Sequence, residues 1–79
     1  MSNTADTIAD IARDVCSPSV PDLSDHDRTL LSSGLDSLDY AGLLMTLEDK
    51  YGIKFSDDDM EDLNTINKLA QRIDAHQDG

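Results

Sequence analysis

The chain has 79 residues, which suffices for one hydrophobic core, so we expect residues 1–79 to fold as a single domain. Its 17 acidic and 6 basic residues give a formal net charge of −11, which argues against partners such as nucleic acid and anionic membrane surfaces. The same charge favours protein partners that present basic patches.

Cysteine content and the N-terminal sequence exclude further classes of protein. Cys16 is the single cysteine, so no internal disulfide is possible, and the absence of C-x-x-C and histidine clusters predicts no metal site. The first residues, MSNTADTIADIARD, lack the basic and apolar regions of a signal peptide, and no apolar run could span a membrane. We therefore expect a cytoplasmic protein that does not insert into membranes. We also expect it to be a monomer.

The first helix is predicted over about residues 4–16, where apolar residues recur at helical spacing: Ile8, Ile11, Ala12 and Val15. About residues 17–36 hold both prolines and many Ser and Asp residues, a composition typical of a loop. Loops of this length in compact domains are usually functional or disordered. The loop nevertheless contains four apolar residues that predict packing onto the helices: Val20, Leu23, Leu30 and Leu31.

The second helix, about residues 37–51, has the strongest helical pattern, with Asp36 or Ser37 available as its cap and Gly52 just past its end. It carries two apolar stripes. The wider stripe is predicted to face the core: Tyr40, Leu43, Leu44, Leu47 and Tyr51. The second stripe, Leu38, Ala41 and Met45, is either covered by the long loop or exposed as a docking surface.

The rest of the chain predicts two more helices. A short third helix is expected over about residues 57–62 with Ser56 as its cap, and a fourth over about residues 65–76. The whole chain thus predicts an all-α, four-helix bundle with a long loop between its first two helices and a short third helix.

Ser37 is the candidate functional residue, and three interpretations are open. It is an ordinary helix cap, a catalytic nucleophile, or a site of modification. A nucleophile needs a nearby base, and the only histidines, His26 and His76, lie in no motif. A phosphate attached to Ser37 would meet the free N–H groups and the positive dipole end of the helix.

The stretch GLDSLDYAGLLMTLEDKYGIKFSDDDMEDLNTI resembles the acyl carrier protein family. That family has a glycine, a variable residue and Asp-Ser-Leu at the start of its second helix. An amphipathic helix, a linker, an acidic third helix and a Thr-aliphatic start to the fourth helix follow. The resemblance covers about residues 30–75 and implies a non-catalytic, four-helix carrier protein.

The resemblance also implies a cofactor and partners. A phosphopantetheinyl transferase would attach 4′-phosphopantetheine from coenzyme A to Ser37, with Asp36 positioning the transferase or its metal. The thiol of the arm would carry an acyl or aminoacyl group as a thioester. A loading ligase or acyltransferase, and a downstream transferase or synthase, would then meet the carrier through basic docking surfaces.

The same resemblance implies roles for further residues. Leu38, Ala41 and Met45 would dock into partner pockets, and Asp39, Glu48 and Asp49 would pair with partner Arg and Lys residues. Met60 and Glu61 would extend that surface, whereas Leu47, Leu63 and Ile66 would line the space for cargo.

Two departures leave the pathway open. Gly42 stands where many fatty-acid carriers have an acid, and the large ring of Tyr40 could fill the cargo space. Fatty-acid, polyketide, aminoacyl and specialised lipid pathways all remain candidates. The alternative function is a small acidic interaction module that is never modified.

Overall fold

The computed structural model describes residues 4–17 and 20–78, which contain four α-helices. They are α1 (Thr4–Cys16), α2 (Ser37–Tyr51), α3 (Asp57–Asp62) and α4 (Ile66–Asp78), with a short 3₁₀ helix, η1 (Leu31–Ser33), before α2. The described residues form no strand, only an isolated bridge between Thr29 and Thr65. The predicted all-α class, with a long first connection and a short third helix, is confirmed.

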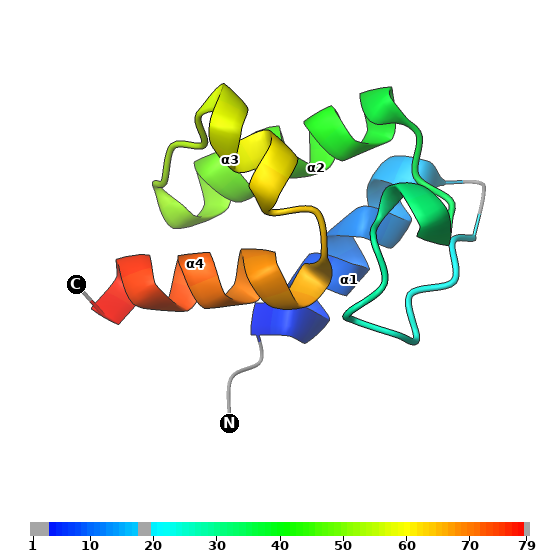
Figure 1. Ribbon diagram of the computed structural model, residues 1–79, viewed down its shortest axis with the longest axis horizontal. Helices are drawn as coiled ribbons and strands as arrows, with labels where there is room; N and C mark the ends of the chain where they lie inside the picture. Colours follow the sequence, from blue (N-terminus) through cyan, green and yellow to red (C-terminus); the bar gives the residue numbers. More distant parts are fainter. Residues whose placement is uncertain (1–3, 18–19, 79) are drawn as a thin grey trace.

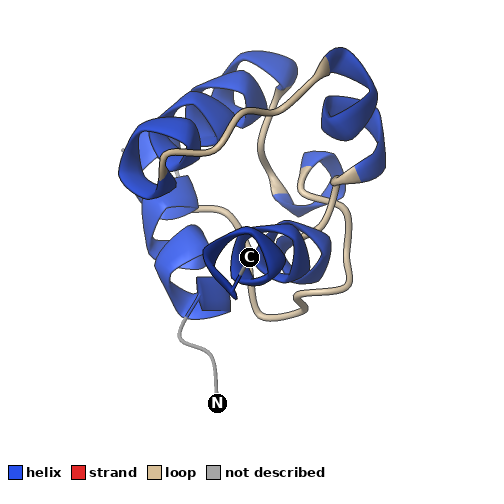
Figure 2. Ribbon diagram, turned by 90° about the vertical axis from the view of Figure 1, so that its left-hand side faces the viewer, coloured by secondary structure: helices blue, strands red, loops and turns tan. Residues whose placement is uncertain are grey.

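The three long helices surround the core, and the short helix lies outside them. In Figure 1, α4 runs across the lower left of the view, α2 lies above it, and α3 stands in front of α2. The first helix packs against both α2 and α4. Figure 2, in which α4 is seen nearly end-on, shows α1 and α3 on opposite sides of the bundle.

The core is built from one apolar face of each long helix and from leucines of the loop. The predicted core face of α2 is correct, since Tyr40, Leu43, Leu44 and Leu47 are buried and Tyr51 is half-buried. Other buried members of the core come from α1, the loop, and the region from the end of α3 through α4: Ile8, Ala9, Ala12, Leu23, Leu30, Leu35, Leu63, Ile66, Leu69, Ala70 and Ile73.

The loop between α1 and α2 packs onto the helices through only part of its apolar set. Leu23 and Leu30 are buried, but Val20 and Leu31 are exposed, so the prediction was wrong for these two. For Leu31, the cause lies at the start of η1, where the Leu30 N–H donates to the Asn64 carbonyl at 2.9 Å. This bond holds Leu30 against the connection to α4, and the next residue turns outward.

Gly42 gives a test of how tightly α1 and α2 pack. It lies inside α2, and a Cβ at this position would meet Val15 Cγ1 of α1 at 4.0 Å, an ordinary van der Waals contact. Alanine favours a helix by about 1 kcal/mol over glycine. We therefore expect Gly42→Ala to raise the melting temperature by about 4–8 °C.

Urea and thermal denaturation of Gly42→Ala and Gly52→Ala provide the comparison. Gly52 follows α2 with φ of +65°, which strains any side-chain-bearing residue, so Gly52→Ala should destabilise the domain. A loss of stability in Gly42→Ala would show that the contact between α1 and α2 cannot accept one methyl group.

Candidate functional site

The start of α2 is fixed by three consecutive residues before Ser37. Gly34 adopts φ of +121°, and a Cβ there would come within 3.3 Å of Pro21, so the turn out of η1 requires glycine. Leu35 is buried and its N–H donates to the Leu30 carbonyl at 3.2 Å. The turn at Gly34 and the buried side chain of Leu35 together direct the chain so that α2 begins at an exposed position.

Asp36, not Ser37, caps the helix. The Asp36 backbone is extended, and its Oδ1 accepts a hydrogen bond from the Asp39 N–H at 2.8 Å. Ser37 is therefore the first residue inside the helix. Its side chain is exposed, and its hydroxyl forms no hydrogen bond with any residue that the structure describes.

The other serine at a helix start behaves differently. Ser56 Oγ accepts from the Asp59 N–H at 3.1 Å, while Asp59 Oδ2 accepts from the Ser56 N–H at 3.1 Å. This reciprocal pair is a complete capping box. The Ser56 hydroxyl is thus engaged in holding α3, whereas the Ser37 hydroxyl is free to react.

The surroundings of Ser37 favour a single attached anion. The first N–H groups of the 15-residue α2 point toward this end, and the helix dipole adds partial positive charge there. Cys16, at the end of α1, is buried and lies beside Asp39. Burial, followed by the charge of Asp39, raises the pKa of Cys16, whose Sγ donates to Asp39 Oδ2 at 3.7 Å.

The second apolar stripe of α2 is exposed. Leu38 is 81% and Met45 66% exposed, and Ala41 between them is half-buried. The alternative that the long loop covers this stripe is therefore wrong. We call Leu38, Ala41 and Met45 the apolar ridge of α2.

The predicted charged docking residues divide into free and engaged groups. Asp49 and Glu61 are exposed, and Asp39 is half-buried beside Cys16. Glu48 is half-buried, and its Oε2 accepts from the Phe55 N–H at 2.8 Å. The Glu48 carboxylate thus holds the connection between α2 and α3.

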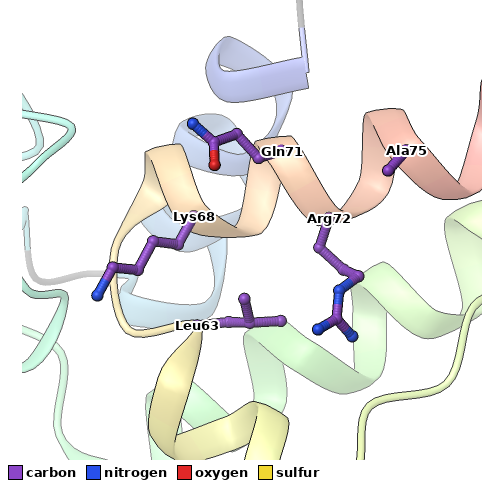
Figure 3. Close-up of a pocket in the computed structure, with 5 residues that line it drawn as sticks. All are labelled: Leu63, Lys68, Gln71, Arg72 and Ala75. Atoms are coloured by element: carbon purple, nitrogen blue, oxygen red, sulfur yellow. The ribbon is translucent and has the colours of Figure 1, made fainter.

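Three further candidate residues point toward the core. Met60 is half-buried against the core, and Leu47 and Ile66 are fully buried within it. Leu63, also predicted to meet cargo, borders an open groove of about 320 Å³ between α3 and α4. Figure 3 shows the residues of this groove: Leu63, Lys68, Gln71, Arg72 and Ala75.

Tyr40 has a polar role that its sequence position did not predict. Its Oη lies 2.6 Å from the Leu63 carbonyl oxygen and 2.9 Å from that of Met60. Burial raises the pKa of Tyr40, so the hydroxyl stays protonated and donates to these carbonyls. The side chain thereby ties α2 to the end of α3.

The described residues contain neither a metal-binding cluster nor a membrane span. In residues 4–17 and 20–78, no group of three His, Cys, Asp or Glu side chains could hold a metal ion. No helix in these ranges is long and apolar enough to cross a bilayer.

Comparison with known proteins identifies relatives of this chain. The model of a family described as a phosphopantetheine attachment site matches residues 6–73. An acyl carrier protein of Zymomonas mobilis is 30% identical over 77 residues, covering 98% of this chain and 99% of that protein.

Two other acyl carrier proteins match a shorter region. The protein of Chlamydia trachomatis is 45% identical over 42 residues, which cover 53% of this chain and 54% of that protein. The protein of Lactobacillus johnsonii is 43% identical over 42 residues, which cover 53% of this chain and 52% of that protein. The chain thus spans about half the length of these two relatives.

Proposed function

This chain belongs to the acyl carrier protein family, the phosphopantetheine carriers, and on that premise we propose that Ser37 bears its 4′-phosphopantetheine group. The observation that carries the proposal is the exposed Ser37 hydroxyl at the first position of α2, left free because Asp36 supplies the cap. When bound, the group supplies a thiol that holds cargo as a thioester.

Ser37 and its neighbours account for the attachment. In a transferase complex, Ser37 Oγ would give its proton to a base of the transferase and bond to the β-phosphorus of coenzyme A, and the pyrophosphate bond would break to release adenosine 3′,5′-bisphosphate. The start of α2 stabilises the single negative charge of the resulting phosphodiester. Asp36 stands exposed beside the reacting hydroxyl, where its carboxylate positions the transferase or its metal.

The domain then acts as a carrier and not as a catalyst. It presents an acyl or aminoacyl thioester to enzymes of a fatty-acid, polyketide, aminoacyl-transfer or specialised lipid pathway. Partner enzymes dock on the apolar ridge of α2, and their basic residues meet Asp49 and Glu61, which are exposed. Apolar contact surrounded by opposite charge suits a transient complex.

The exposed apolar ridge also supports a second candidate function, an acidic interaction module that is never modified. The intact mass of the protein after incubation with a transferase distinguishes the two functions. Wild type, Ser37→Ala and Ser56→Ala are incubated with coenzyme A and a broad-specificity phosphopantetheinyl transferase, and intact masses are measured.

We expect the wild type and Ser56→Ala to gain one phosphopantetheine group and Ser37→Ala to gain none. Ser56→Ala is the matched control, because it removes a helix-start serine and costs only about 1 kcal/mol of cap energy. Equal mass gain in Ser37→Ala would refute the assignment of Ser37, and unchanged wild-type mass would favour the interaction module.

A further inference from the structure

We propose that Tyr40 determines the class of cargo by closing the space between α2 and α3, so that this carrier holds short or polar acyl groups outside its helices. The inference rests on the proposed attachment of phosphopantetheine to Ser37. It goes beyond that attachment by naming the residue that selects cargo and the kind of cargo selected.

The first support is the position of the Tyr40 side chain. It starts on α2, is only 8% exposed, and its hydroxyl reaches the carbonyl oxygens of Met60 and Leu63 at 2.9 and 2.6 Å. Carbonyls at the end of a helix lack partners within the helix. Moving the ring aside would leave these carbonyls and the hydroxyl unpaired, which opposes opening.

The second support is how little else holds α3 in place. None of its six residues is fully buried, and Met60, its one apolar residue, packs only partly against the core. Arg72 of α4 pairs with Asp59 at 3.0 Å, but the Arg72 side chain is 42% exposed, and such pairs contribute little. Tyr40 is therefore a principal tie between α3 and the bundle, and removing it should loosen α3.

The third support is the absence of apolar space for a long chain among the described residues. Leu43, Leu47 and Ile66 fill the core around Tyr40 with almost no exposure, and protein interiors are close-packed. The groove beside the end of α3 is open to solvent and does not enclose a chain, and Lys68 and Arg72 project along it from α4 (Figure 3). A long alkyl chain would bury little of its apolar surface there, whereas a short or polar group does not require a buried site.

The experiment compares acetyl and octanoyl cargo on the same chain. Acetyl- or octanoyl-coenzyme A and a broad-specificity transferase load each variant, and intact mass confirms one acyl-phosphopantetheine per chain. Melting temperatures are then measured, because a buried alkyl chain stabilises the folded state. The melting temperatures of the two loaded forms are compared within each variant. This difference does not contain the loss of stability that the substitution itself causes.

We expect the octanoyl and acetyl forms of the wild type to melt within about 2 °C of each other. In Tyr40→Leu, the octanoyl form should melt at least about 5 °C higher, since the chain enters the vacated space. Tyr40→Phe, which keeps the ring and loses only the hydroxyl, should show a smaller shift of the same sign. The matched control is Tyr51→Leu, which changes the half-buried tyrosine of α2 and should behave as the wild type.

Several results would overturn the inference. An octanoyl shift of about 5 °C or more in the wild type would show that Tyr40 does not exclude long cargo. The inference also fails if neither Tyr40→Phe nor a folded Tyr40→Leu gains a shift, or if Tyr51→Leu gains the same shift. No mass gain in the wild type would instead refute the attachment itself, and this outcome is recognised before any melting is measured.

Discussion

Leu47→Asp is expected to unfold the domain under conditions in which Met45→Asp stays folded. Leu47 is fully buried in the core, and an aspartate there would place an unpaired carboxylate among apolar side chains, at a cost of several kcal/mol. That loss is about as large as the whole stability of many small domains. Met45 is mostly exposed, so the same substitution should cost less than about 1 kcal/mol.

Urea denaturation of the two variants beside the wild type checks this prediction. Both substitutions add one aspartate to α2, two residues apart, so they share the change in charge and differ mainly in burial. If Met45→Asp lost as much stability as Leu47→Asp, the apolar ridge would be part of the core and could not serve as a docking surface.

Met45→Asp should also lower kcat/KM for phosphopantetheine loading by about tenfold, which corresponds to about 1.4 kcal/mol of lost transition-state binding. Apolar anchors dominate small interfaces, and a carboxylate in a partner's apolar pocket would lose its hydration. The measurement is the initial rate of loading at varied carrier concentration. The fold of the variant is established by the denaturation experiment above.

Val20→Asp is the control for the loading assay. Val20 is 86% exposed and lies on the long loop, so this substitution adds the same charge to an exposed apolar site that is not part of α2. It should leave the loading rate within about twofold of the wild type, because it removes no anchor. Equal loss in both variants would assign the effect to net charge and not to the apolar ridge.

The helices were predictable from sequence because their apolar residues recur at helical spacing. Ile66, Leu69 and Ile73 form one face of α4, and all three are buried in the structure. The loop has no such period. Nothing in its sequence distinguishes Leu30, which enters the core, from Leu31, which faces solvent.

The exposed position of Ser37 at the start of α2 was predictable from sequence, but the hydrogen bonds around it were not. Asp36 and Ser37 are both good capping residues, and only the backbone of the folded chain shows that Asp36 takes the cap. Glu48 looked like a free surface acid, yet it accepts from the Phe55 N–H seven residues away. Tyr40 donates to backbone carbonyls, which every residue has, so no sequence pattern could name its partner.

Attachment of phosphopantetheine to Ser37 is tested most directly by tandem mass spectrometry of the loaded, trypsin-digested protein. Cleavage after Arg28 and Lys50 releases residues 29–50, which contain Ser32, Ser33 and Ser37. Ser32 Oγ accepts from Thr29 Oγ1, and Ser33 Oγ donates to the Thr29 carbonyl, so both are engaged in η1. We expect fragments that place the whole group on Ser37; fragments that place it on Ser32, Ser33 or any serine outside this peptide would contradict the assignment.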